Sequence, residues 1–149
     1  MAHSDLPLKI ARHMLENDLF SLWLGIEILE AAPGRSVLQM TVRKEMTNGF
    51  KVSHGGVAFS LADSALAFAA GSHGRIAMTI DSSISFFNAV KAGDCLTARA
   101  EEENLGSQTA VYNVTVSNQR DETVAVMRGT AYRTKKKFFE PYPGSEGSE

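Results

Sequence analysis

The segment from Gly55 to Gly71 constrains the fold of this chain more than any other part of its sequence. It contains no proline, it is rich in alanine, and its apolar residues occupy most sides of a helix rather than one stripe. Alanine favours helix strongly, and a helix that is apolar on most of its surface is stable only when other elements bury it. Gly71 supplies a stop signal at its end. The chain is therefore predicted to fold around one long central helix.

The other segments supply elements that can wrap such a helix. Ahead of it, residues 11–24 carry apolar side chains on a helical stripe after Pro7, a hairpin turns at residues 32–35, and residues 44–53 have the composition of a loop. After it come four segments rich in β-branched and aromatic residues, namely 75–90, 94–104, 108–118 and 123–134. Their order predicts an antiparallel meander. The fold class is therefore α+β, with an antiparallel sheet wrapped around the central helix.

Length and charge limit the number of domains and the kinds of partner. A chain of 149 residues suits one domain over residues 1–134, followed by a tail over 135–149 that is first basic and then of flexible composition. A net charge of −2 argues against a nucleic-acid partner, which needs a concentrated basic surface. No signal sequence or membrane-spanning stretch is apparent, and the single cysteine, Cys95, gives neither an internal disulfide nor a cysteine metal cluster. We therefore expect a cytoplasmic protein without membrane association.

The start of the central helix is the candidate functional site. Gly55 and Gly56 leave the backbone N–H groups at the helix N-terminus uncovered, and these donors, with the helix dipole, favour an anion or a developing oxyanion. Asp63 is the only charged residue between Lys51 and Arg75. An ionised group in an apolar helix is retained when it is paired or used in chemistry. Asp63 is thus either a reactive carboxylate or the ion-pair partner of Arg75 or Lys51.

The motifs around this site resemble those of the hot-dog fold thioesterases, and within them the phenylacetic-acid degradation (PaaI-type) acyl-CoA thioesterases. The resemblance covers almost the whole chain and is carried by Glu16-Asn17-Asp18, Met46-Thr47-Asn48-Gly49, His54-Gly55-Gly56, Phe59-Ser60-Leu61-Ala62-Asp63, Gly93-Asp94, Val111-Tyr112 and Arg128-Gly129. It implies a hot-dog fold and hydrolysis of an acyl-CoA thioester, with phenylacetyl-CoA or hydroxylated phenylacetyl-CoA as the expected substrate. Coenzyme A would enter only as part of the substrate, with no separate cofactor and no metal.

The resemblance also implies a role for each candidate residue. Asp63 would be the catalytic carboxylate, the Gly55 amide an oxyanion donor, and Asn48 and His54 supporting polar groups, while Thr79 falls where relatives place a Ser or Thr near the water. Several points stay open. Asp63 either attacks the carbonyl or activates a water, and His54 polarises the carbonyl, orients Gly55 or caps the loop. Asn48, which precedes a glycine, is also typical of a turn.

Two features depart from the family pattern. Relatives often carry an Arg-Pro pair after the long third strand, where this chain has Asn88-Ala89, so a cationic contact to CoA is not expected from that point. The run from Lys135 to Phe139 has no counterpart, and it either touches CoA phosphates or is a solvated end. Asp81 interrupts an apolar strand and is interpreted as an outward-facing or interface residue.

Two other functions are compatible with parts of the pattern. The first is a hot-dog hydratase or dehydratase, which would need a histidine acid or base partner on the helix, and Asp63 has no such partner in the sequence. The second is a non-catalytic acyl-CoA binding module.

The spacing of Gly55 and Asp63 predicts a site shared between two chains. With a rise of ~1.5 Å per residue, eight residues separate the two groups by ~12 Å along one helix, too far for one carbonyl to touch both. A second protomer must then place its own Asp63 against Gly55 across a two-fold axis. We therefore expect an obligate dimer, and a tetramer that is a dimer of such dimers, in which sheets join edge to edge around two antiparallel helices.

Overall fold

The chain begins with helices, continues with a pair of strands and the long central helix, and ends with four strands, the order that the sequence predicts. The computed structural model describes residues 5–139. Its helices are α1 (Leu6–Asn17), α2 (Leu19–Leu24), a short 3-10 turn η1 (Lys44–Met46) and α3 (Gly55–Gly71). Its strands are β1 (Glu27–Ala32), β2 (Arg35–Thr41), β3 (Arg75–Phe86), β4 (Cys95–Leu105), β5 (Thr109–Ser117) and β6 (Thr123–Lys137). No helix in this part of the chain has the length and apolar character needed to cross a membrane.

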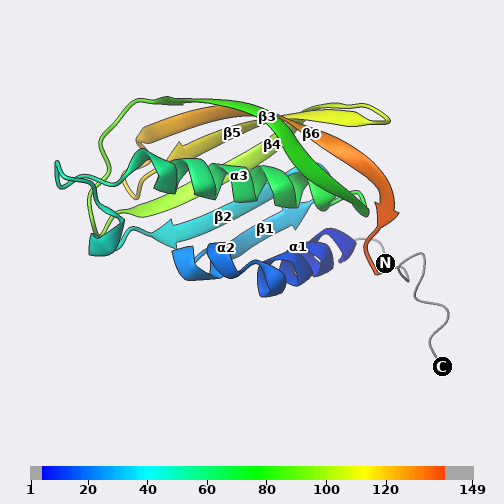
Figure 1. Cartoon of the computed structure of the whole chain (residues 1–149), viewed down its shortest axis with the longest axis horizontal. Helices are drawn as coiled ribbons and strands as arrows, with labels where there is room; N and C mark the ends of the chain where they lie inside the picture. The colour runs from blue at the N-terminus through cyan, green and yellow to red at the C-terminus, as the bar shows by residue number, and fades with distance from the viewer. Residues whose placement is uncertain (1–4, 140–149) are drawn as a thin grey trace.

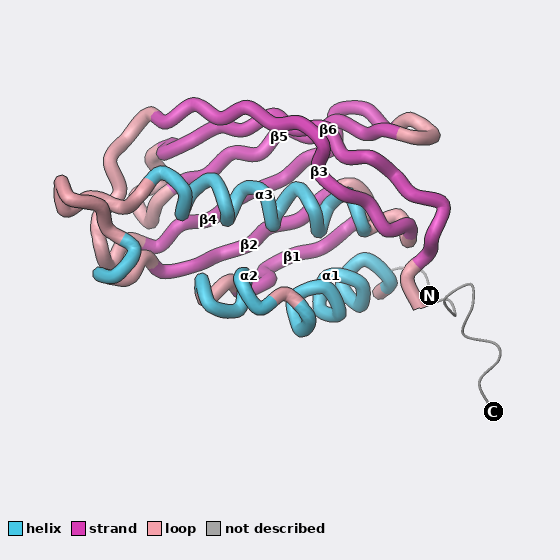
Figure 2. Tube along the Cα trace, viewed as in Figure 1, coloured by secondary structure: helices cyan, strands magenta, loops and turns pink. Residues whose placement is uncertain are grey.

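One six-stranded antiparallel sheet forms a single layer, with α3 lying across one face and α1 and α2 beside the β1 edge (Figures 1 and 2). The strand order is β1-β2-β4-β5-β6-β3. The predicted meander is therefore correct for β4, β5 and β6 but wrong for β3, which pairs with β6. Placing β3 at the far edge lets the sheet cover both flanks of α3, since β2 and β3 both contact the helix.

The α3 helix is the centre of the hydrophobic core, as its composition predicts. Its buried side chains include Leu61, Leu66 and Phe68, and they face alternating apolar residues of the central strands such as Tyr112 and Val114. Close packing requires Gly129 on β6, because a Cβ there would overlap Cδ1 of the fully buried Leu66. The helix is held on the sheet by burial of nearly all its apolar surface.

The opening helix differs from the single helix expected over residues 11–24. α1 begins earlier, with Pro7 in its first turn, and the chain breaks at Asp18 before α2. Asp18 is the N-cap of α2, and its side chain accepts hydrogen bonds from the backbone N–H of Ser21 (2.9 Å) and from the Ser21 hydroxyl (2.5 Å). The cap at Asp18 thus separates two helices, although the apolar stripe continues from one to the other.

The C-terminal ends of β3 and β6 also differ from the expected ones. β3 ends at Phe86 rather than at residue 90, and β6 continues three residues past Thr134 because Lys137 pairs with Arg75 at the start of β3. The side chain of Arg75 fastens this end by donating to the carbonyl oxygens of Thr134 (2.7 Å) and Arg133 (3.0 Å). The predicted flexible segment from Pro141 onward lies outside the described residues.

A bulge in β3 decides which of its side chains face α3. Thr79 pairs with Ala131 and Asp81 with Thr130, so Ile80 is an extra residue between them. Because of this extra residue, the alternation between side chains that face α3 and side chains that face away shifts by one position along β3. Thr79 faces the helix, whereas Ile80 and Asp81 are both exposed.

Candidate active site

His54 caps the N-terminus of α3. It occupies the N-cap position, and its Nδ1 accepts a hydrogen bond from the Gly56 N–H at 2.9 Å. Of the three roles considered for this residue, capping is the one that forms within a single chain. The bond occupies one of the free N–H groups at the helix start.

The Gly55 N–H is the donor that stays available. It has no acceptor among residues 5–139, and Gly55 itself is exposed. A Cβ at this position would lie 3.3 Å from Cζ of Phe86, so a side chain would crowd the approach to the amide. Glycine thus keeps a backbone donor open at the positive end of the helix dipole.

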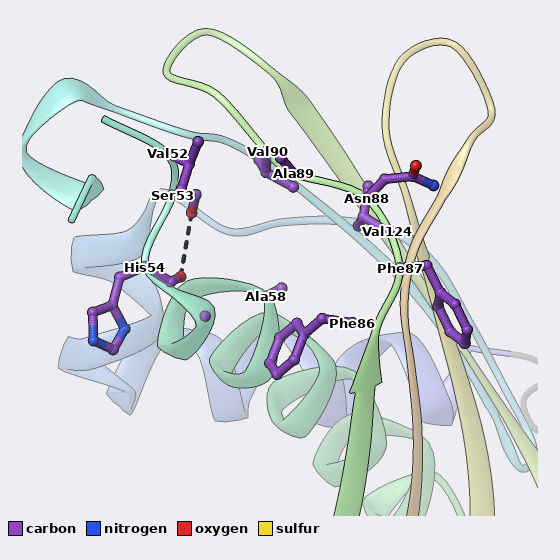
Figure 3. Close-up of a pocket in the computed structure, with 11 residues that line it drawn as sticks. Val52, Ser53, His54, Ala58, Phe86, Phe87, Asn88, Ala89, Val90 and Val124 are labelled. Carbon is purple, nitrogen blue, oxygen red and sulfur yellow. Dashed lines mark hydrogen bonds between the residues drawn. The ribbon is translucent and has the colours of Figure 1, made fainter. Parts of the chain in front are cut away.

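A cavity of about 280 Å³ opens beside this amide (Figure 3). Gly55 and Ala58 of α3 form one wall, and Phe86 and the following residues to Val90 form the opposite wall. Asn88 stands here where relatives often carry arginine, and its Nδ2 donates to the Thr123 carbonyl at 2.6 Å. The cavity therefore has no cation from that position.

Asp63 and Thr79 form a second cluster two turns along the same helix. The Thr79 hydroxyl donates to Oδ1 of Asp63 at 2.9 Å, and both residues are half-buried. Within residues 5–139 no ion pair joins Asp63 to Arg75 or Lys51, because Arg75 is engaged with backbone carbonyls. The structural alternative for Asp63, an ion pair with either cation, is therefore wrong.

Asn48 lies in the loop before α3 and makes a turn there. Its Oδ1 accepts from the N–H of Phe50 (2.9 Å) and, at 3.4 Å, from that of Val52. The loop is closed by an isolated pairing of Thr47 with Ser53. Asn48 thus shapes the segment that leads into His54, and one chain does not bring it to Asp63.

The C-terminal basic run lies at the other end of α3. Phe138 approaches within 3.3 Å of where a Cβ of Gly71 would be, and Phe139 packs on α1, with its ring 5.1 Å from that of His13 and 4.5 Å from Lys9 Nζ. Phe138 is therefore half-buried against the end of α3, whereas Phe139 contacts α1 but stays 48% exposed. Among the described residues, no group of three or more metal-ligating side chains could hold an ion.

One chain therefore brings together two half-sites, His54 with Gly55 and Asp63 with Thr79, but not the two halves with each other. Phe86 is a neighbour of Gly55 that the sequence analysis missed. The signal was the doublet Phe86-Phe87, which interrupts the strand alternation at the point where β3 ends.

Comparison with known proteins identifies the family of this chain. Residues 50–125 match the family described as the Thioesterase superfamily. The chain belongs to the thioesterase superfamily. It is 43% identical over 123 residues to the acyl-coenzyme A thioesterase PaaI of Escherichia coli K12, which covers 83% of this chain and 88% of that one. The expected enzyme class, a thioesterase, is confirmed.

Solved structures confirm the fold of this thioesterase. The E. coli PaaI protein from the phenylacetic acid degradation operon superimposes with a TM-score of 0.88 and 40% identity over 90% of this chain and 97% of that one. A Streptococcus mutans UA159 protein bound to acetyl CoA gives a TM-score of 0.73 and 29% identity over 75% of this chain and 90% of that one. The predicted hot-dog fold is therefore correct.

Proposed function

We propose that this thioesterase hydrolyses acyl-CoA to a carboxylic acid and free CoA, with phenylacetyl-CoA or a hydroxylated phenylacetyl-CoA as its substrate. The E. coli relative is an acyl-CoA thioesterase, and its structure is that of a protein from a phenylacetic acid degradation operon. The observation that carries the proposal is the carboxylate of Asp63, half-buried on the central helix and held by Thr79 without a cation.

The Gly55 amide is the proposed oxyanion donor. Attack on a thioester carbonyl creates a tetrahedral species whose negative oxygen needs donors fixed in advance, and one such donor is worth about 2.7 to 4 kcal/mol. The N–H of Gly55 has no acceptor within residues 5–139, it belongs to the first turn of α3, and Gly55 itself is exposed. His54 supports this turn through its cap on Gly56.

Asp63 acts either as the general base, which takes a proton from water, or as the nucleophile. With Oδ1 bonded to Thr79, Oδ2 is left to act on a water or on the carbonyl carbon. In the first route Asp63 takes a proton from water, the C–O bond forms, the C–S bond breaks, and the proton passes to the departing thiolate. In the second, Asp63 attacks the carbonyl carbon, the C–S bond breaks and CoA leaves as the thiolate. Water then hydrolyses the mixed anhydride, which releases the acid, restores the carboxylate of Asp63 and supplies the proton that the thiolate takes up.

The two halves are proposed to meet across a dimer interface. The ~12 Å separation along α3 requires the donor and the carboxylate to come from different chains. β3 supports this arrangement, because it is a 12-residue strand at the end of the sheet order, and its outer edge has no partner strand within residues 5–139. Long uncovered edges invite pairing with another chain. A second copy would cover this edge, and two such dimers would make the proposed tetramer.

The first test is Asp63→Asn, which keeps size but can neither accept the proton nor attack. We expect kcat for phenylacetyl-CoA to fall at least about a hundredfold while KM stays within a few-fold. Thr79→Ala should lower kcat less, because it removes only the group that orients the carboxylate. Asp5→Asn is the matched control, since Asp5 is exposed at the N-cap of α1, outside α3 and β3, and it should leave kcat unchanged.

The assay separates the proposed reaction from its rivals. Release of free CoA, detected with a thiol reagent, supports hydrolysis, whereas a change in enoyl absorbance would indicate a hydratase. Tight binding without turnover would indicate a binding module. Near wild-type turnover by Asp63→Asn would make Asp63 structural and overturn the mechanism.

A further inference from the structure

A second cavity, of about 350 Å³, lies between α2 and the first turns of α3. Phe20 and Trp23 of α2 form one wall, Met46 of η1 forms the floor, and His54 and Gly56 form the side nearest the proposed oxyanion donor. Small-molecule sites have volumes of about 300 to 1,000 Å³, so this one suits a single small group rather than a whole CoA ester.

The aromatic wall of this cavity is exposed and flat. The rings of Phe20 and Trp23 are stacked, with centroids 6.1 Å apart and an interplanar angle of 16°. The two residues are 55% and 54% exposed, although large aromatic side chains gain most when they are buried. A third ring placed against this wall would remove apolar surface from water and extend the stack.

Contacts within the protein hold this aromatic wall in place without a ligand. The guanidinium of Arg43 lies 5.0 Å from the Trp23 ring centre, and its Nη2 donates to the Trp23 carbonyl at 2.7 Å. α2 is also joined to α3 by a hydrogen bond of 2.8 Å between the hydroxyls of Ser21 and Ser64, next to Asp63. A preorganised wall loses little side-chain freedom when a ligand binds.

The cavity borders the turn that holds the proposed reaction centre. Figure 3 shows the His54 ring on the side of the helix start turned away from Phe86, so the cavity at Phe86 and the cavity at Trp23 flank the same turn. A thioester whose carbonyl oxygen meets the Gly55 N–H could then extend in two directions. One must take the acyl group and the other the CoA arm.

The linings of the two cavities favour one assignment. The cavity at Trp23 offers two stacked aromatic rings to an aromatic acyl group. Its carboxylate, Glu45, is paired with the Arg43 guanidinium at 2.8 Å, so neither charge is left to hold a phosphate of CoA. The cavity is therefore the one suited to the uncharged acyl group.

We infer that the cavity between α2 and α3 binds the aromatic ring of the acyl group, and that Trp23, with Phe20 behind it, determines the preference for arylacetyl over straight-chain thioesters. The inference rests on the proposed function. It assigns substrate choice to a short N-terminal helix outside the sheet.

The test compares kcat/KM for phenylacetyl-CoA and hexanoyl-CoA. Trp23→Ala should lower the ratio of the two values about tenfold, because the straight chain loses less when the ring surface is removed. Trp23→Phe should restore most of the ratio. Leu22→Ala is the matched control, since Leu22 is a half-exposed residue of the same helix that does not line the cavity, and its ratio should stay at the wild-type value. Equal losses for both substrates, or an unchanged ratio, would overturn the inference.

A binding measurement distinguishes this inference from the proposed function. Trp23 is the only tryptophan in the chain, so its emission reports on this wall alone. In the Asp63→Asn background, phenylacetyl-CoA should change the emission in a saturable way, and CoA alone should not. No change with phenylacetyl-CoA would refute the cavity assignment even if the wild type hydrolyses the ester. A clear change without any turnover by the wild type would refute the hydrolase and keep the binding site.

Discussion

Asp94 shows how one buried carboxylate can stabilise a turn and make stability depend on pH. Its two oxygens accept from the Lys91 N–H (2.9 Å) and from Nε2 of Gln119 (2.8 Å), and these bonds hold the pKa of Asp94 below its ordinary value of 3.8. A lowered folded-state pKa adds stability above the unfolded value, and this stability is lost as the pH falls through the folded value. Asp94→Asn should therefore lower the free energy of unfolding at pH 7, and the deficit should shrink at pH 3. Urea unfolding at both pH values measures it, and a deficit of equal size at both would contradict the assignment.

At the scale of an element, α2 depends on its cap. Asp18→Ala removes the acceptor for the Ser21 N–H and should cost about 1 kcal/mol in the free energy of unfolding. Asp5→Ala is the matched control, because Asp5 stands at the N-cap of α1 without a capping hydrogen bond from its side chain, and it should change stability by less than about 0.5 kcal/mol. Chemical denaturation of both variants gives the comparison. If the two losses were equal, the Asp18 bonds would contribute nothing beyond those of an ordinary surface residue.

The elements also show where sequence reasoning succeeds and stops. Both ends of the central helix could be predicted to the residue. Its alanine-rich composition, the His54-Gly55-Gly56 sequence at its start and Gly71 at its end all indicate the same bounds. The resemblance placed Thr79 near the water but did not predict its contact with Asp63, because the bulge at Ile80 sets which strand residues face the helix. The position of β3 beside β6 was mispredicted, since strand order depends on pairings between distant segments that local patterns do not encode. The break at Asp18 had a local signal, the Asp18–Ser21 cap, that the apolar stripe concealed.

At the scale of the whole molecule, the proposed shared site predicts that two inactive variants restore activity together. Asp63→Ala lacks the carboxylate, and Gly55→Pro lacks the amide donor. When they are unfolded and refolded in equal amounts, half of the dimers are mixed, and each mixed dimer holds one intact site. About a quarter of wild-type activity should return. A tag on one variant verifies mixing, and folded, mixed dimers without recovered activity would exclude the shared site.

The burial of α3 determines how this enzyme should lose its activity on heating. Reactive groups commonly stand on surface loops, which can open locally while the rest of a protein stays folded. Here Gly55 and Asp63 belong to the helix that forms the centre of the core. Beyond the exposed first turn, the backbone amides of that helix should be among the last to exchange with solvent, and the proposed reaction centre belongs to no separate loop that heat could loosen first. Catalysis and the native fold should therefore be lost at the same temperature.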